Sequence, residues 1–439
     1  MYPNDSHVQA PISRRVLVVL VAAVTVRPIV DLFGRFEGEA LNPGGVIGVL
    51  FAIGILVLVL VSRGSWGLRG QGLLVLLAFI FMLSLTHVTF SDDPRAASVN
   101  FARLVVGYSS ALLVPSVARI GLNHTAPAAV RAVAAIATVS LVPAAIAWLQ
   151  FGGVLPYSYF DWHDGAWVGR PSGGYHQPNS LGRLLAFVAL YVGVLAAARK
   201  LSTKWVLGLW LGIIVTTFVS THRTSIAATA IIITASLAIA YANYDRVQSL
   251  IRAVARFALV GVAVSGVAVL AAPHPTVDFV GQSLQRTARV VLQGVWSSSN
   301  ESGVNLRGRE RIWLDSIEHL AQREPASLLF GAGSAPFEAH NELLNAFMLY
   351  GTLGVAALAM VHGVTLMIAW STTSRTGRKF LLVPLLYYLM FSTTLQPLDY
   401  PYFMWLYFAA QTLVVSMFRR HAKPTHRPTH DTLRSAQRT

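Results

Sequence analysis

The chain has 439 residues, of which 54% are hydrophobic and only 12% are charged, and its mean hydropathy is +0.56. A soluble globular protein carries about twice that share of charged residues. The composition therefore excludes an ordinary soluble domain and indicates a polytopic membrane protein. The sequence contains no cysteine, which excludes disulfides and thiolate metal sites.

Apolar runs long enough to cross a bilayer as helices, about 17 to 25 residues each, recur along the chain. The first follows Arg14 and Arg15 and has no small-residue cleavage site, so we expect a membrane span there and not a cleaved signal peptide. We predict an all-α fold with about twelve transmembrane helices. They cover roughly 15–32, 44–62, 71–88, 98–118, 128–150, 179–198, 204–220, 224–242, 253–272, 340–370, 380–396 and 400–418.

Basic residues are distributed unevenly between alternate loops. If the N-terminus is cytoplasmic, the inner segments hold 21 of the 34 basic residues but only Asp5, Asp245 and Asp431 among the 19 acidic ones. This asymmetry follows the positive-inside rule and predicts that both termini are cytoplasmic. It also explains the net charge of +15 without a nucleic-acid partner, because a basic inner face lies beside anionic lipid.

The predicted outer side carries most of the remaining polar sequence, above all one long loop between the ninth and tenth spans. Apolar residues at three- and four-residue steps predict an amphipathic helix at about 277–295, and a second helix is expected at about 309–320. The expected regions are a cytoplasmic N-terminus 1–14, nine spans within 15–272, the outer loop 273–339, three spans within 340–418 and a basic disordered tail 419–439.

Arginines at the predicted outer face are candidates for binding an anionic group. Arg223 stands in the pinched turn after the seventh span, where a guanidinium needs a partner, a water-filled cavity or access to the interface. Arg307, Arg309 and Arg311 share one short stretch, and planar guanidinium groups bind phosphate oxygens bidentately. Contact with lipid headgroups, or a solvated loop surface, is the alternative explanation for this cluster.

His340 precedes a long apolar segment, and a neutral imidazole at a helix start could take a proton from a sugar hydroxyl. A purely structural histidine is the alternative. Asn341 is a supporting candidate beside it, His176 is expected to order the loop before the sixth span, and Asn179 is expected to cap that span. The sequence has no Asp-x-Asp pair, no H-E-x-x-H motif and no Walker loop, so we predict neither a metal nor a cofactor.

Several motifs around the long outer loop match a known pattern. They are Gly308-Arg309-x-x-x-Trp313, Gly331-x-Gly333, and His340-Asn341 followed ten residues after the Asn by Gly351-x-x-Gly354. This region resembles the signature region of the bacterial O-antigen ligase and polymerase family. The resemblance implies a GT-C-like, metal-independent, inverting glycosyltransferase of the bacterial inner membrane, acting on its outer face.

The same resemblance assigns partners and roles. The donor would be a glycan on undecaprenyl diphosphate, and the acceptor a hydroxyl of a glycan, of lipid A core or of another molecule. Arg223 and Arg309 would neutralise the diphosphate, with Arg307 or Arg311 as replacements for Arg309, and His340 would activate the acceptor. The uninterrupted His340-Asn341 and glycine pattern favours a ligase, while a repeat-unit polymerase remains open.

Two other classes remain open. Twelve spans with both termini inside also describe secondary transporters and flippases of lipid-linked glycans, although these usually show internal repeats, which are not detected in this sequence. A non-catalytic membrane scaffold is the third class. It gives no reason for arginines and a histidine to gather on one face.

Overall fold

The computed structural model describes residues 43–62, 67–119, 122–155, 171–175, 178–220, 223–241, 309–334, 339 and 341–420. Within these ranges the protein is all-helical, and the only β pairing is an isolated bridge between Thr373 and Arg419. The helices are α2 (Pro43–Ser62), α3 (Leu68–Phe90), α4 (Pro94–Ser109), η3 (Ser110–Leu112), α5 (Leu113–Arg119), α6 (Leu122–Phe151), α7 (Pro178–Ala197), α8 (Thr203–Val219), α9 (Arg223–Tyr241), α12 (Arg309–Ala321), α13 (Pro325–Phe330), α14 (Glu342–Thr372), α15 (Arg375–Thr394), η4 (Pro397–Asp399) and α16 (Pro401–Phe418).

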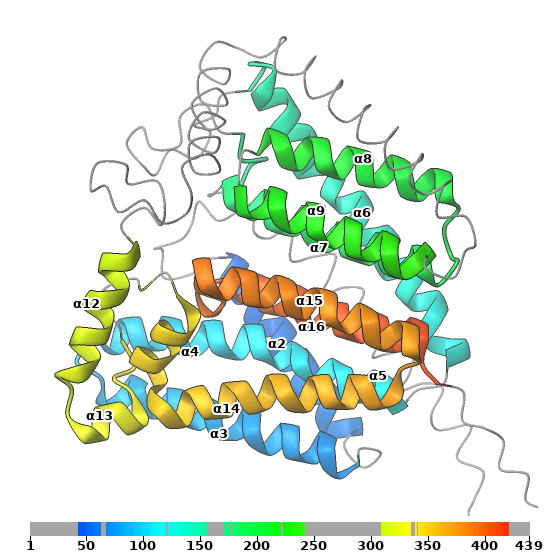
Figure 1. Cartoon of the computed structure of the whole chain (residues 1–439). Helices are drawn as coiled ribbons and strands as arrows, with labels where there is room; N and C mark the ends of the chain where they lie inside the picture. The colour runs from blue at the N-terminus through cyan, green and yellow to red at the C-terminus, as the bar shows by residue number, and fades with distance from the viewer. Residues whose placement is uncertain are drawn as a thin grey trace, which may run out of the picture.

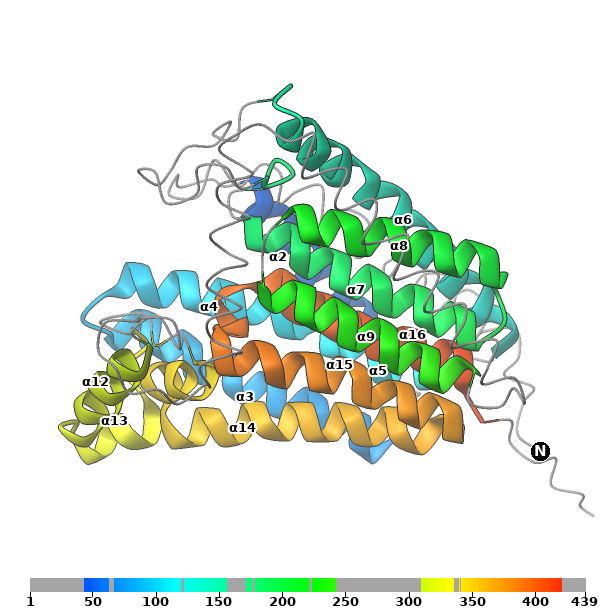
Figure 2. The ribbon, with the colours of Figure 1, turned by 45° about the horizontal axis from the view of Figure 1, so that its top comes forward.

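The long helices run side by side, as Figures 1 and 2 show. At the centre lies α16, which packs against α4, α5, α6, α7, α14 and α15. Every residue from Tyr402 to Ser416 is buried. A helix that is apolar on all sides is stable only when other helices or lipid cover it, and here neighbouring helices do so.

Peripheral helices show large apolar side chains on the outer surface of the bundle. Leu50 of α2 is 61% exposed, Val75 of α3 67% and Leu141 of α6 64%. Exposed apolar surface of this extent is unfavourable in water and favourable in the hydrocarbon core of a bilayer. Among the described residues, six helical segments are long and apolar enough to cross a membrane. They are Leu68–Phe90, Pro94–Ala118, Ala126–Phe151, Asn179–Ala197, Thr224–Tyr241 and Glu342–Thr372. The chain is therefore a membrane protein.

Each predicted span that falls in the described ranges corresponds to a helix, except that 98–118 covers α4, η3 and α5 in succession. The break between the seventh and eighth spans is real, because α8 ends at Val219 and α9 begins at Arg223. The second helix predicted in the long loop is confirmed as α12. The predicted spans 15–32 and 253–272 and the amphipathic helix at about 277–295 lie outside the described residues, so the number twelve stays a prediction.

Two predicted boundaries need correction. The tenth span begins at Glu342 and not at residue 340, because the Asn341 side chain caps it by accepting from the Leu344 amide at 3.2 Å. The tail was expected to be disordered from residue 419, but its first two residues are tied to the bundle. Arg419 forms the bridge with Thr373, and the Arg420 amide donates to the Thr372 carbonyl at 2.9 Å.

One end of the bundle holds α12, α13, η4 and the start of α14 (Figures 1 and 2), and we call it the α12 end. The glycine pairs noted in the sequence meet there. Gly351 interrupts α14 with φ +63° and ψ −168°, and Gly331 and Gly333 also have positive φ. The break lets two segments approach closely: the Ala332 amide donates to the Met348 carbonyl at 3.1 Å, and the Gly333 amide donates to the Leu349 carbonyl at 2.9 Å.

Side chains reinforce this contact. Arg323 Nη1 donates to the Met348 carbonyl at 2.8 Å, and Thr352 Oγ1 donates to the Leu328 carbonyl at 3.0 Å. Arg323 Nη2 lies 3.2 Å from His319 Nε2. Partial burial, together with the positive charge of Arg323, lowers the pKa of His319, so the imidazole is neutral at pH 7 and can accept this hydrogen bond. The break in α14 is thus hydrogen-bonded to α12, α13 and the turn that follows them.

We predict that Gly351→Ala destabilises the protein, because a non-glycine residue at these dihedral angles costs about 1–3 kcal/mol. A Cβ atom there would also press on the backbone of Leu329 and Gly331. Gly363→Ala is the matched control on the same helix, since an added Cβ meets nothing within 4 Å. Thermal unfolding in detergent should show a lower Tm for the first variant and an unchanged or slightly higher Tm for the second. Equal Tm values for the two variants would contradict the assignment.

Candidate functional site

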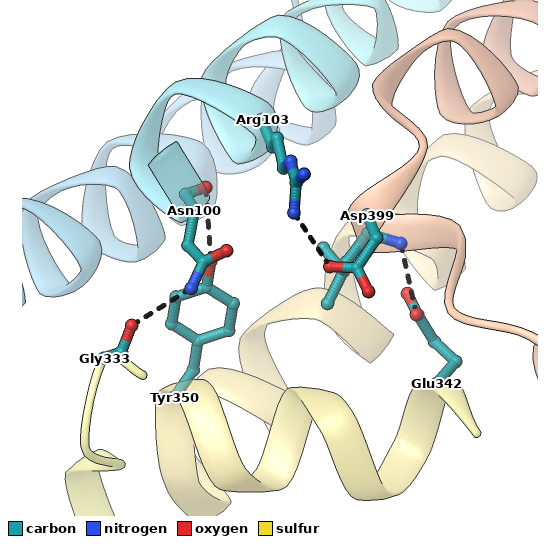
Figure 3. A network of polar contacts seen from close by, with 7 residues as sticks. Asn100, Arg103, Gly333, Glu342, Tyr350 and Asp399 are labelled. Atoms are coloured by element: carbon teal, nitrogen blue, oxygen red, sulfur yellow. Dashed lines mark hydrogen bonds and ion pairs between the residues drawn. The ribbon is translucent and has the colours of Figure 1, made fainter. Parts of the chain in front are cut away.

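A network of polar contacts joins three elements at the α12 end (Figure 3). From α4, Asn100 Nδ2 donates to the Gly333 carbonyl at 3.2 Å, and the Asn100 carbonyl lies 3.5 Å from Tyr350 Oη of α14. Also from α4, Arg103 Nη1 lies 3.5 Å from Asp399 Oδ1 of η4. It is the one ion pair found within the described ranges. Its side chains are 40% and 22% exposed, so its contribution to stability is about 0.2–1 kcal/mol.

Glu342, in the first turn of α14, completes this network. Its Oε2 accepts from the Leu398 amide of η4 at 3.1 Å, which fixes η4 to the start of α14 (Figure 3). The side chain is buried. Its Oε1 has no hydrogen-bond partner, and neither does the buried Nδ2 of Asn345 one turn later. Polar atoms of this kind are available to a ligand or to water.

A second polar group lies inside the bundle, on α7. Arg183 is fully buried, its Nη1 donates to Tyr402 Oη at 2.9 Å, and its Nε and Nη2 have no partner. Beside it, Gly182 lets α7 approach α9, because a Cβ at that position would collide with Ser225. The start of α9, the second turn of α7 and the start of α16 are therefore in contact.

These contacts connect the segments on which the predicted site residues lie. Arg223 is the first residue of α9, which packs on α7. Through Arg183, α7 contacts Tyr402 of α16. The short helix η4, which precedes Tyr402 in the chain, is hydrogen-bonded to Glu342. Asn341 precedes Glu342 and follows His340 in the chain. The backbone segments of Arg223 and Asn341 are thus joined by a continuous set of contacts at the α12 end.

Several predicted side chains lie outside the described residues. These are Arg223, Arg309 and Arg311, whose backbones belong to α9 and α12, together with Arg307, His340 and His176. Asn341 is described, and its side chain acts as a helix cap. Asn179 was expected to cap the sixth span, but it is the second residue of α7, since Pro178 already occupies the first position. Proline is favoured there because its missing amide has no helical acceptor.

Five residues of these contacts were not predicted from the sequence: Arg183, Glu342, Asn100, Arg103 and Asp399. A signal was present for Arg183, because it is the one charged residue within the apolar segment 179–198. Asp399 and Glu342 are single acidic residues at the ends of apolar runs. Acidic residues also occur there when a helix end is simply solvated. Their mutual contacts depend on tertiary packing and have no local signature.

Within the described ranges, no three His, Cys, Asp or Glu side chains come close enough to hold a metal ion. The chemistry that the described site offers is hydrogen bonding, a buried carboxylate and guanidinium groups. The chain was also compared with known proteins. No protein-family model matches it, and a search of curated proteins finds no relative.

We predict that Asn341→Ala weakens the start of α14 by about 1 kcal/mol, because it removes the acceptor of the Leu344 amide. Asn341→Ser keeps an acceptor at the same place and serves as the matched control. Hydrogen exchange at the first turn of α14 should accelerate in the alanine variant and remain near the wild-type rate in the serine variant. Unchanged exchange in Asn341→Ala would show that the cap is dispensable.

Proposed function

We propose that the protein is a metal-independent, inverting membrane glycosyltransferase. It transfers a glycan from undecaprenyl diphosphate to an acceptor hydroxyl at the outer face of the bacterial inner membrane. The proposal takes the α12 end as the outer end, both termini as cytoplasmic, and the architecture as GT-C-like with about twelve spans. The supporting observation is the set of contacts that joins the starts of α9, α14 and α16 at one end of the bundle: two hydrogen bonds, and the close approach of Gly182 to Ser225.

The resemblance noted in the sequence gives these segments their roles. Arg223 and Arg309, with Arg307 or Arg311 as a substitute for the latter, bind the diphosphate. The acceptor oxygen attacks the anomeric carbon, the bond from that carbon to the phosphate oxygen breaks, and the diphosphate leaves with the bonding electrons. His340 takes the proton of the acceptor hydroxyl. Fixed positive charge in a site with little water stabilises the leaving group most effectively.

The described residues fit this mechanism in two ways. Asn341 and Glu342 fix the start of α14, and with it the point at which His340 enters the site. Tyr350, Asn100 and Gly333 hold the turn after α13 against α4, on the same side. A ligase moves a finished glycan in one step, and we favour it over a polymerase on the uninterrupted His340-Asn341 and glycine pattern.

One observation keeps a second class open, a flippase or transporter of lipid-linked glycans. His362 lies within α14, twenty residues after Glu342, with its Nε2 3.1 Å from Tyr108 Oη. Its ring packs against Tyr388 and Tyr407. An ionisable side chain inside a membrane span often marks a transport or proton pathway. The described residues give His362 aromatic partners and no carboxylate within ion-pair distance.

The decisive experiment is transfer from a synthetic undecaprenyl-diphosphate glycan to an added acceptor, by purified protein in EDTA. We expect His340→Ala to lower turnover by about 10²–10⁴-fold, the usual contribution of a general base. His421→Ala, in the C-terminal tail, is the matched control and should leave turnover unchanged. Product length distinguishes one-step ligation from polymerisation. Full activity in His340→Ala would refute the assigned base.

The role of Arg309 has its own test in the same assay. At limiting donor, Arg309→Ala should reduce kcat/KM by about 10²–10³-fold, the loss seen when one charge-stabilising group is removed. Arg378, at the opposite end of the bundle, is the control for a general loss of positive charge. Should Arg309→Ala and Arg378→Ala both keep wild-type kcat/KM, the diphosphate role would pass to Arg307 or Arg311. Translocation of the donor across vesicles without transfer would replace the enzyme with the flippase.

A further inference from the structure

The buried guanidinium of Arg183 is held in one orientation by three aromatic side chains. Its Nη1 donates to Tyr402 Oη at 2.9 Å. Its Cζ lies 4.0 Å from the ring centroid of Tyr400 and 4.7 Å from that of Phe391, so the faces of the group contact π systems. Such contacts stabilise a cation and fix the plane of the guanidinium. They leave its opposite edge without a partner.

The edge of the guanidinium without hydrogen-bond partners has a specific geometry. The two atoms without hydrogen-bond partners are Nε and Nη2. Their N–H bonds run parallel, and together they form the fork with which arginine binds two oxygens of one carboxylate or phosphate. Two buried donors on the same edge indicate the kind of ligand, because two parallel N–H groups match a single anion that offers two oxygens.

The charge of Arg183 also lacks a counter-ion among the described residues. The one acidic group paired there with an arginine is Asp399, and it faces Arg103. No carboxylate of the described part lies within 4 Å of Arg183, and its nearest polar partner is the neutral hydroxyl of Tyr402. An uncompensated buried cation is strongly destabilising, whereas burial is tolerated when an anion supplies the missing charge and hydrogen bonds.

Arg183 lies close to the start of α9, the segment that holds Arg223. It is the sixth residue of α7, so a rise of 1.5 Å per residue places it about 8 Å along the helix from its start. Gly182 contacts Ser225 in the first turn of α9, two residues after Arg223. On the other side, Tyr400 follows Asp399 of η4, which is tied to Glu342 through Leu398.

We propose that the Nε–Nη2 fork of Arg183 binds a phosphate group of the polyprenyl diphosphate, about one and a half helical turns from the start of α7. The site lies between α7, the end of α15 and the start of α16. It places a further arginine beside the segment of Arg223, since α7 packs on α9. Because the donor is taken from the proposed function, the identity of the ligand rests on that function, but binding of a phosphate at Arg183 can be measured without turnover.

The test is equilibrium binding to purified full-length protein in detergent, measured by native mass spectrometry and by ligand-induced change in Tm. The probes are undecaprenyl diphosphate, inorganic pyrophosphate, phosphatidylglycerol and the uncharged undecaprenol. Wild-type protein should bind undecaprenyl diphosphate, and Arg183→Gln should raise its Kd at least tenfold. Arg183→Lys keeps the charge but loses the parallel fork, so its Kd should lie between those two.

Arg378→Gln is the matched control. Arg378 also lies over an aromatic ring, 5.6 Å from the Trp370 centroid, and donates to a carbonyl, but it is at the opposite end of the bundle. Its Kd for undecaprenyl diphosphate should equal that of the wild type. Equal binding of undecaprenol and undecaprenyl diphosphate, or a wild-type Kd in both Arg183 variants, would overturn the proposal. If Arg183→Gln does not fold, the Arg183→Lys comparison decides alone.

The probes also separate the source of the phosphate from the proposed activity. Tighter binding of phosphatidylglycerol than of undecaprenyl diphosphate would replace the donor by a structural lipid and overturn the proposal as stated. Arg183-dependent binding of the diphosphate without any glycan transfer would keep this inference and reject the glycosyltransferase. If Arg183→Gln transfers the glycan with wild-type kcat/KM at limiting donor, the glycosyltransferase is kept and the role of Arg183 in donor binding is rejected.

Discussion

The contact between the turn at Gly331 and the break at Gly351 determines how α12 and α13 pack on α14 at the α12 end. Inside a bilayer every backbone polar group needs a partner within the protein, so a span can be interrupted only where another segment supplies one. The amides of Ala332 and Gly333 and the Arg323 side chain do so for the carbonyls of Met348 and Leu349. Glycine is required on both sides, since a Cβ on either would enter the backbone of the other. The helices α12 and α13 are thereby fixed to α14.

Hydropathy alone was sufficient to predict the long apolar helices of the described part, but not the short helix α13. Each apolar run in the described part became a helix, because a segment such as α8 or α16 offers no other way to satisfy its backbone in lipid. It failed at boundaries where side-chain chemistry decides. Residue 340 was placed inside the tenth span, yet the helix begins after the Asn341 cap, and the tail was given as disordered from 419, yet Arg420 bonds to Thr372. The glycine pattern was predicted to matter only through its resemblance to a family motif. The packing shows its physical reason, which is the close approach of the Gly331 and Gly351 segments at positive φ.

The candidate site was less predictable than the fold. Motif spacing singled out polar residues outside the predicted spans, because charged residues between apolar runs are easy to find in an apolar sequence. Arg183 was overlooked within a span, and Glu342 within the first turn of another, since a single charge in an apolar run has the same appearance whether it faces lipid, a partner or a ligand. The distinction lies in the surroundings: Arg103 has Asp399 and is half exposed, whereas Arg183 has three aromatic rings and no carboxylate in the described structure.

The complete burial of α16 constrains how the molecule can move. Alternating access in transporters is largely a rigid-body rocking of one helical bundle against another around a central site. Here α16 packs on α6 and α7, and also on α4, α5, α14 and α15. Rocking of these helices against one another would require one set of these contacts to separate along most of a buried helix. The packing of α16 therefore favours a bundle that does not cycle, which suits the proposed transferase better than a transporter.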